Sequence, residues 1–375
     1  MTIKMKRFTP DWVSLPGETI TDLLEERGWT QAEFAMRMEL SQKHVNEIIK
    51  AKTPITRDTA LKLERVLGST AEFWLNREEQ YQQNLARLNE IKRLESWSEW
   101  AKKLPIHDLM QHGYIPTRRV AKKYFAEIVD DLLRLFKVAS PAAWEAHTAK
   151  MSGSFRCTRA DQSDFGAISS WIRLGEIEAE KVDSPKFNKS TFEESLETIR
   201  PLTLSHFNEI EDTLKEICLK SGVILVIIPS IPRAHVSGIA RWLKPNQPII
   251  QLSLYGKTND RIWFTFFHEV AHLLKQDKKE IFLDEIDGKR VDLKEEREAD
   301  KWASEFLIPS KYSNELKTLK SEKSVLEFAS EINIHPGIVV GRLQHDGIIK
   351  YTHLNKLKES YKSQYFSNFS SVNIG

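Results

Sequence analysis

The segment from Trp263 to Leu274 contains two histidines, His268 and His272, four residues apart, with Glu269 beside the first. Residues i and i+4 project from one face of a helix, so both imidazoles can bind one metal ion, and neutral imidazole suits Zn²⁺. Glu269 would lie next to that ion, where a carboxylate can take a proton from the attacking water. The spacing therefore predicts a zinc-dependent hydrolytic site with His268 and His272 as ligands and Glu269 as general base.

A catalytic zinc ion usually takes three ligands from the protein and one water molecule. The acids of a second helix, predicted over 295–307, are the candidates for the third position: Glu295, Glu296, Glu298, Asp300 and Glu305. The apolar residues of this helix predict its buried face: Ala299, Trp302, Ala303, Phe306 and Leu307. Glu298 lies one turn before Trp302 at the edge of that face, so we expect Glu298 to be the third ligand.

A small sheet is predicted just before the metal helix. The β-branched run 223–228 and the segments 238–243 and 248–253 indicate three short strands in a mostly antiparallel sheet. A substrate peptide would add as an extended strand along the edge formed by 238–243. His235, Arg241 and Tyr255 are candidates to stabilise an oxyanion, although each is more simply an ordinary surface residue.

The N-terminal eighty residues predict several short amphipathic helices. Two of them, starting after Thr30 and Ser41, are joined by a turn of about four residues, which is helix-turn-helix geometry. In this motif the start of the second helix enters the major groove of DNA, where Gln and Asn pair with adenine and Lys with guanine. We therefore expect DNA contacts from one set of polar residues: Gln31, Gln42, Lys43, His44, Asn46, Lys50 and Lys52.

The charge of the chain bounds how it binds nucleic acid. Lys and Arg number 55 against 53 Asp and Glu, a formal net charge of +2, so no global field attracts the chain to DNA or to a membrane. Residues 41–57 carry four basic residues and one acid, so the attraction is local to the predicted reading edge. Weak binding by one copy, strengthened by a homodimer, is expected.

Composition and cysteine usage point to a cytoplasmic protein. The apolar fraction is 41% and the charged fraction 29%, as in ordinary globular domains, and two cysteines cannot form a disulfide framework. The longest apolar run, 223–228, is far shorter than the ~20 residues of a membrane helix. No membrane association is expected.

The N-terminal region resembles the Cro/C1-type (XRE) helix-turn-helix family. The matching blocks are Pro16-Gly-Glu-Thr-Ile, Glu26-Arg-Gly-Trp-Thr-Gln-Ala-Glu-Phe-Ala35 and Ser41-Gln-Lys-His-Val-Asn-Glu-Ile-Ile. The continuation Ile55-Thr-Arg-Asp-Thr-Ala-Leu and Leu67-Gly-Ser-Thr-Ala-Glu-Phe-Trp-Leu-Asn76 is similar to the HigA antitoxin branch. This resemblance implies an operator-binding domain that is usually dimeric.

The C-terminal region resembles the ImmA/IrrE metallopeptidase family. The blocks that match are Trp263-Phe-Thr-Phe-Phe-His-Glu-Val-Ala-His-Leu-Leu and Glu296-Arg-Glu-Ala-Asp-Lys-Trp-Ala-Ser-Glu-Phe-Leu-Ile-Pro309, in which Asp300 stands where Asn is common. The resemblance implies zinc ligands at His268, His272 and Glu298, the general base at Glu269, and limited proteolysis of a helix-turn-helix repressor.

Together these patterns predict an α+β, predominantly helical chain: a five-helix DNA-binding domain over 1–82, a helical middle region over 83–200, and a zincin-like peptidase domain over 201–375. The expected function is a DNA-binding regulator whose Zn²⁺ endopeptidase domain cleaves a repressor or a toxin–antitoxin protein. The alternative is a HigA-like autorepressor whose zinc domain senses a signal or binds a partner without cleaving it.

Overall fold

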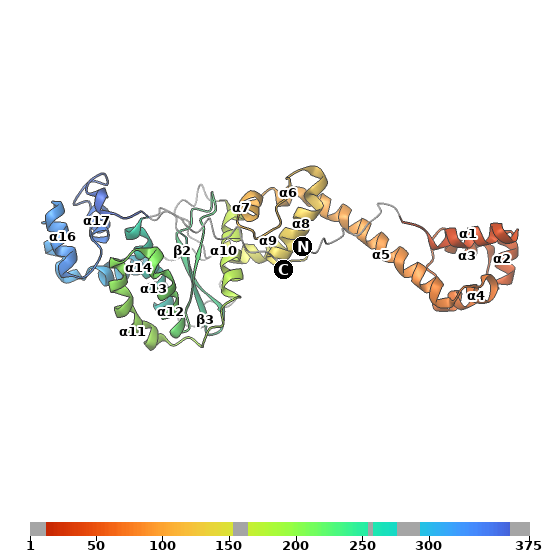
Figure 1. Cartoon of the computed structure of the whole chain (residues 1–375), viewed down its shortest axis with the longest axis horizontal. Coiled ribbons are helices and arrows are strands. Elements are labelled where there is room, and N and C mark those ends of the chain that lie inside the picture. The colour runs from red at the N-terminus through yellow and green to blue at the C-terminus, as the bar shows by residue number, and fades with distance from the viewer. Residues whose placement is uncertain (1–12, 153–163, 254–257, 276–292, 361–375) are drawn as a thin grey trace. The chain divides into compact units, whose positions relative to one another are not determined.

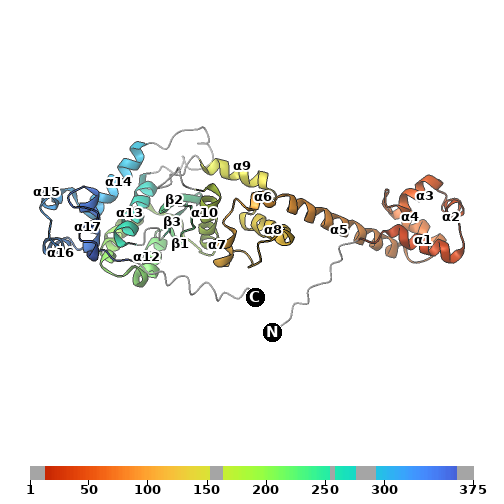
Figure 2. The ribbon, with the colours of Figure 1, turned by 90° about the horizontal axis from the view of Figure 1, so that it is seen from above.

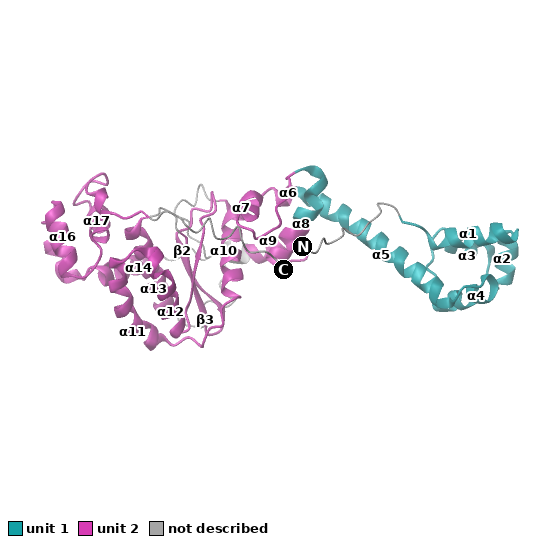
Figure 3. Ribbon diagram, viewed as in Figure 1, with its two compact units in different colours: residues 1–98, 121–129 teal, residues 99–120, 130–375 magenta. Residues whose placement is uncertain are grey.

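The structure is a computed structural model that describes residues 13–152, 164–253, 258–275 and 293–360 (Figure 1). The chain divides into two compact units, residues 1–98 with 121–129 and residues 99–120 with 130–375 (Figure 3). Within the described residues, no helix is long and apolar enough to cross a membrane.

The first unit contains a bundle of five helices: α1 (Pro16–Arg27), α2 (Gln31–Arg37), α3 (Gln42–Ile49), α4 (Arg57–Leu67) and α5 (Ala71–Ser96). The last four begin after hydroxyl residues, Thr30, Ser41, Thr56 and Thr70, whose side chains each accept a hydrogen bond from a backbone N–H of the first turn. Their apolar faces meet in one core. The prediction of a helical N-terminal domain is confirmed.

The position of α3 in this bundle depends on a close approach of α1. A Cβ atom added at Gly17 would lie 1.9 Å from the carbonyl oxygen of Ile49 at the end of α3, so only glycine permits this contact. Val45 and Ile48 of α3 are buried. The opposite face of α3 is therefore left toward solvent.

Four helices of the middle region follow: α6 (Ser98–Ala101), α7 (Ile106–Gln111), α8 (Phe125–Phe136) and α9 (Pro141–Ser152). Trp144 of α9 is buried and makes edge contacts with Trp100, Phe136 and Phe165, each with ring centroids 5.9 Å apart. Aromatic packing thus connects this region to the start of α10 (Phe165–Ala179).

The second unit is built on a three-stranded sheet of β1 (Ile224–Ile228), β2 (Gly238–Lys244) and β3 (Gln247–Ser253), in the order β1-β3-β2. β2 pairs with β3 antiparallel, but β1 pairs with β3 parallel, so the sheet is mixed rather than mostly antiparallel. The apolar run of β1 is almost wholly buried, which is typical of a parallel strand covered on both faces.

Helices cover both faces of this sheet (Figures 1 and 2). α10 packs on one face, while α12 (Phe207–Lys220) and α13 (Asn259–Lys275) pack on the other, with α11 (Lys189–Ile199) beside α12. Helix α14 (Leu293–Leu307) packs against α13. The chain then forms α15 (Ser313–Leu316), α16 (Glu322–Glu331) and α17 (Pro336–His345), and short 3₁₀ turns lie at Lys122–Tyr124, Arg200–Leu204, Ser310–Tyr312 and Asn355–Leu357.

The units differ from the boundaries expected from the sequence. Helix α5 runs without a break past residue 82, and α10 and α11, expected in a middle region over 83–200, belong to the unit that contains the sheet. Helix α10 is buried around most of its circumference, so it requires a covering surface on several sides, and the sheet provides one of them. Periodicity alone does not identify that partner.

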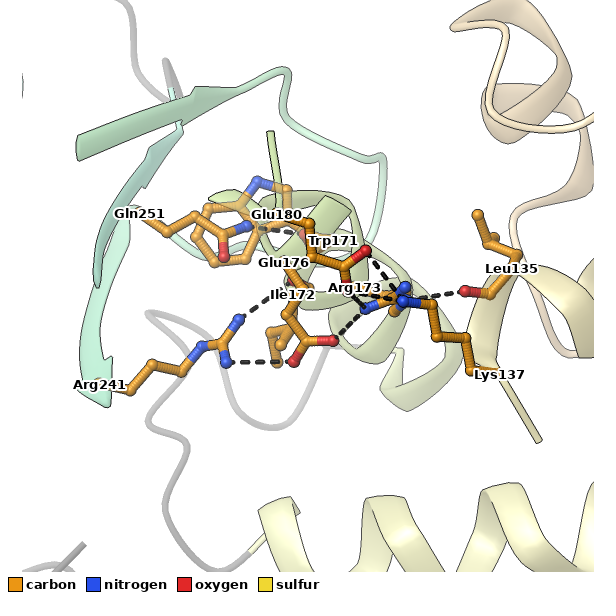
Figure 4. Close-up of polar contacts among 9 residues, drawn as sticks. All are labelled: Leu135, Lys137, Trp171, Ile172, Arg173, Glu176, Glu180, Arg241 and Gln251. Carbon is orange, nitrogen blue, oxygen red and sulfur yellow. Dashed lines mark hydrogen bonds and ion pairs between the residues drawn. The ribbon is translucent and has the colours of Figure 1, made fainter. Parts of the chain in front are cut away.

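A polar network fixes α10 to its neighbours on one side (Figure 4). The Arg173 side chain is only 9% exposed, and its guanidinium donates to the Leu135 carbonyl at 2.7 Å, to Glu176 at 2.7 Å and to Glu180 at 3.1 Å. Lys137 also donates to Glu180. The segment that ends α8 is therefore held to α10 by charge-assisted bonds.

The same helix is fixed to the sheet on its other side (Figure 4). Arg241 of β2 pairs with Glu176 at 3.1 Å and donates to the Ile172 carbonyl at 3.3 Å, while Gln251 of β3 donates to the Trp171 carbonyl at 2.7 Å. Glu176 thus pairs with two arginines, the buried Arg173 and the largely buried Arg241. Arg241, considered above for an oxyanion role, is instead committed to this network on the face of the sheet that α10 covers.

Candidate metal centre

His268 and His272 lie on the exposed edge of an otherwise buried helix. Helix α13 buries a stripe of large apolar residues against the sheet and α14: Ile262, Trp263, Phe266, Phe267 and Val270. The two histidines are 15% and 17% exposed, and their Nε2 atoms are 3.0 Å apart. As the i, i+4 spacing predicts, both imidazoles point to the same place.

The acid beside this pair is Glu296, not Glu298. Glu296 Oε2 lies 3.5 Å from His268 Nε2, and its Oε1 lies 3.5 Å from His272 Nε2. Glu298 is 48% exposed and pairs instead with Lys275 at 3.2 Å. The expectation that Glu298 completes the set is therefore wrong for the geometry of the described residues.

The burial of α14 explains this correction. Its fully buried positions are Ala299, Ala303 and Leu307, and Glu296 precedes Ala299 by three residues on the same stripe. Trp302, which led us to place Glu298 at the edge of the buried face, is itself only partly buried. The 3-4-4 spacing of 296, 299, 303 and 307 was the signal that identifies the acid facing α13.

These three side chains form a group that could hold a metal ion. One ligand atom from each of His268, His272 and Glu296 lies within 4.8 Å of the others. Tetrahedral bonds of 2.0–2.2 Å separate ligand atoms by about 3.3–3.6 Å. The two Nε2 atoms are 3.0 Å apart, and each lies 3.5 Å from a different oxygen of Glu296, Oε2 for His268 and Oε1 for His272. Two imidazoles and one carboxylate are also a donor set that suits Zn²⁺.

Asp300 supports His268 from behind. Its Oδ1 lies 2.8 Å from His268 Nδ1, although the ring N–H does not point along that line, so the contact is electrostatic. Burial would by itself lower the pKa of His268, but the nearby carboxylates of Asp300 and Glu296 outweigh it and raise this pKa to about 10. Burial and the charge of His268 lower the pKa of His272. The acids around the pair favour a cation at this position.

Glu269 lies on the sheet side of the histidines and is only 8% exposed. It accepts a hydrogen bond from the Ala240 backbone N–H of β2. Burial raises the pKa of Glu269 to about 7, against the smaller lowering effects of His268 and of this N–H. A carboxyl with such a pKa can accept and return a proton near neutral pH.

Strand β2 packs closely on α13 at Gly238, chiefly against Thr265. A Cβ atom at Gly238 would lie 2.6 Å from Thr265 Cγ2 and 3.1 Å from Glu269 Cγ. The Ser253 N–H donates to the Ser237 carbonyl, and with the β2–β3 register this leaves the main-chain groups of 238 and 240 pointing away from β3. We had no sequence signal for Gly238, because only the packing shows its role.

The predicted DNA-contacting residues lie on the solvent side of the first unit. Gln31, Gln42, Lys43, Lys50 and Lys52 are exposed, and His44 and Asn46 are half-buried. Glu47 lies 4.0 Å from Lys43 and 3.8 Å from His44, so this acid reduces the positive charge of the face. The side chains are accessible for the contacts predicted from the sequence, which remain predictions.

The fold and these sites define a helix-turn-helix domain joined to a domain of metallopeptidase type. Residues 20–74 match the helix-turn-helix family, and residues 224–344 match the IrrE N-terminal-like domain of the M78 peptidase family. The chain therefore carries a helix-turn-helix domain in its N-terminal region and an IrrE N-terminal-like domain in its C-terminal region.

Individual relatives match the N-terminal region. The uncharacterized HTH-type transcriptional regulator YddM of Escherichia coli K12 is 34% identical over 61 residues, 16% of this chain and 65% of YddM. Virulence-associated protein I of Dichelobacter nodosus is 35% identical over 72 residues, 19% of this chain and 67% of that protein. The chain thus spans about two thirds of the length of these curated relatives.

One solved structure is also similar. It is an addiction module antidote protein of the HigA family from Coxiella burnetii, with 30% identity over 22% of this chain and 91% of that chain, and a TM-score of 0.21.

Proposed function

We propose that this chain is a DNA-binding regulator whose C-terminal domain is a zinc endopeptidase that cleaves a regulatory protein. The observation that carries the proposal is the convergence of His268, His272 and Glu296 beside the buried carboxyl of Glu269. Two histidines and two acids gathered at the edge of an apolar helix have no structural need for one another, whereas a hydrolytic metal site requires this set.

Each side chain has a defined task in this proposal. His268, His272 and Glu296 hold the metal, and Asp300 supports His268 through its second ring nitrogen. When bound, zinc would supply Lewis-acid polarisation of a carbonyl and activation of water near neutral pH. Glu269, oriented by the Ala240 N–H, accepts a proton from water and returns it to the leaving amine.

The substrate would be an extended segment of a protein. β2 is an edge strand of the described sheet, and its outward main-chain groups lie beside Glu269. Backbone pairing along this edge would bring a peptide bond next to the metal ligands without demanding particular side chains. A repressor or a toxin–antitoxin protein with an accessible linker fits this requirement.

The N-terminal domain would bind an operator as a homodimer, with the residues around the start of α3 in the major groove. The net charge of +3 over residues 41–57 is modest, so affinity must come from two copies bound to one site. The peptidase could then act on a protein bound near the same DNA.

Intact-mass proteomics tests the peptidase activity. Cells that express the wild-type chain should accumulate a truncated form of one regulatory protein, and cells that express Glu269→Gln should not, because the general base is missing while the metal ligands remain. Identical protein profiles, with zinc bound to both forms, would reject proteolysis and favour a zinc domain that senses a signal or holds a partner.

A further inference from the structure

A cavity lies between α13, α14 and α17, and its lining does not include His268, His272 or Glu296. Its volume is about 660 Å³, within the range of small-molecule and peptide sites. It is lined by Phe264 of α13, Ser304 of α14 and Ile338 of α17, and residues 351–360 close one side. None of the roles described above uses this space.

The cavity begins one helical turn from the metal centre on two helices. Phe264 precedes His268 by four residues, and the centroids of these two rings are 6.2 Å apart. Ser304 follows Asp300 by four residues, and Asp300 contacts His268. Four residues of a helix span about 6 Å, which is the length of two residues of extended peptide. A chain lying over the metal ligands therefore reaches the cavity within two residues.

The lining combines an apolar floor with one arginine, Arg261, whose charge is not matched by a neighbouring acid in the described part of the chain. Leu307, Ile308 and Ile338 are buried and form apolar walls with Phe264. Arg261, Arg342 and Lys358 line the cavity, but Lys358 pairs with Asp260 and Arg342 with Asp346, each at 2.6 Å. Arg261 is thus the lining cation without an ion pair among the described residues. His345 also lines the cavity. The site thus favours an apolar group joined to an anionic one.

We infer that this cavity is a specificity site of the proposed peptidase, and that it receives a bulky apolar residue next to an acidic residue in the substrate. The inference rests on the proposed function, because it takes the occupant to be part of the cleaved protein. Backbone pairing along β2 gives little discrimination, so a side-chain cavity beside the metal would supply the choice of cleavage position.

Binding without turnover tests the cavity independently of cleavage. The full chain carrying Glu269→Gln is titrated with the acetylated hexapeptide amides Ala-Ala-Leu-Glu-Ala-Ala and Ala-Ala-Ser-Lys-Ala-Ala, followed by saturation-transfer NMR. The Leu-Glu peptide should bind at least about tenfold more tightly, because burial of one leucine accounts for that factor. Equal affinity for the two peptides would overturn the inference.

Two variants locate the binding. Ser304→Trp places an indole in the cavity and should weaken the Leu-Glu peptide more than tenfold, whereas Lys301→Trp, on the exposed side of the same helix, should not. Arg261→Glu, at an exposed position, should weaken the Leu-Glu peptide but not its Leu-Gln counterpart. Undiminished binding to Ser304→Trp or an unchanged preference in Arg261→Glu would contradict the cavity as the site.

The two proposals fail in different ways. If Leu-Glu peptides bind in the cavity and the wild-type chain cuts nothing in cells, the cavity stands as a peptide-binding site and proteolysis is rejected. If the chain cuts a protein but Ser304→Trp leaves both peptide binding and the cleavage position unchanged, proteolysis stands and the specificity site is rejected.

Discussion

Glu176 pairs with two largely buried arginines, Arg173 and Arg241, and its replacement by leucine would leave Arg241 without an acid partner. Arg241 is 15% exposed in its side chain, its Nε atom is buried without a hydrogen bond, and its remaining contact is the Ile172 carbonyl at 3.3 Å. Arg173 would lose only one of its polar contacts, since it keeps Glu180 at 3.1 Å and the Leu135 carbonyl at 2.7 Å.

The loss of unfolding free energy in Glu176→Leu depends on how exposed the Glu176–Arg241 ion pair is. Removal of one partner of a buried ion pair typically destabilises a protein by about 3–5 kcal/mol, because a charge remains in a poorly hydrated place. Glu176 is 22% exposed, so we expect a value near the lower end, about 3 kcal/mol for the second unit. Glu176→Leu combined with Arg241→Met should recover most of this loss, since no unpaired charge is then left on the sheet.

Urea unfolding and hydrogen exchange measure this effect. The unfolding midpoint of the second unit should fall in Glu176→Leu, and the amides of β2 and α10 should exchange faster, while those of α1–α4 keep their protection. Glu178→Gln is the matched control on the same helix. Its ion-pair partner Lys181 is 62% exposed, and the glutamine can still accept the hydrogen bond of the Tyr114 hydroxyl, so the change should cost no more than about 1 kcal/mol. A smaller loss of unfolding free energy in Glu176→Leu than in Glu178→Gln would refute this explanation. It would also be refuted if Glu176→Leu with Arg241→Met lost as much stability as the two single changes added together.

Three further predictions concern other parts of the chain. Gly238→Ala should destabilise the second unit by about 1–3 kcal/mol and displace Glu269. Thr265→Ser should restore the stability of the Gly238→Ala chain, because it removes the Cγ2 atom that lies 2.6 Å from the new Cβ. A Gly238→Ala chain that is as stable as wild type in urea unfolding would contradict this contact. The double variant Gln42→Ala with Asn46→Ala should bind the DNA upstream of the chain's own coding sequence about tenfold or more weakly at fixed salt. The control Gln83→Ala on α5 should bind this DNA as wild type does. Wild-type affinity in the double variant would remove Gln42 and Asn46 from the DNA-contacting residues. Burial raises the pKa of Glu211, so the ionisation of this carboxyl opposes folding, and the stability of the chain should decline as pH rises from the ordinary glutamate pKa through the raised one. Glu211→Gln should therefore have a higher melting temperature than wild type at pH 7 and the same melting temperature at pH 4. A lower melting temperature of Glu211→Gln at pH 7 would contradict this sign.

The sequence was sufficient for the features that depend on local spacing. The i, i+4 histidines fix which side chains share a face of α13, and hydroxyl caps mark where α2 to α5 begin. The helix-turn-helix order follows from these local signals, and it was predicted correctly. Such features need no knowledge of what packs against the helix.

Features that depend on a partner element were not available from the sequence. The choice between Glu296 and Glu298 turns on which side of α14 faces α13, and two acids only two residues apart straddle that boundary. The parallel pairing of β1 with β3 requires knowing that β2 lies on the far side of β3. Gly238 matters only because Thr265 and Glu269 lie against it.

The metal content of matched glutamate variants tests the central claim most directly. Zinc is measured by plasma mass spectrometry on the purified full chain, on Glu296→Gln and on Glu298→Gln, each with its fold checked by circular dichroism. We predict one zinc ion per wild-type chain and a large loss of zinc in Glu296→Gln. Glu298→Gln should keep nearly the wild-type content, because this carboxylate contacts only Lys275 among the described ion pairs. Full zinc content in Glu296→Gln together with a loss in Glu298→Gln would contradict this prediction.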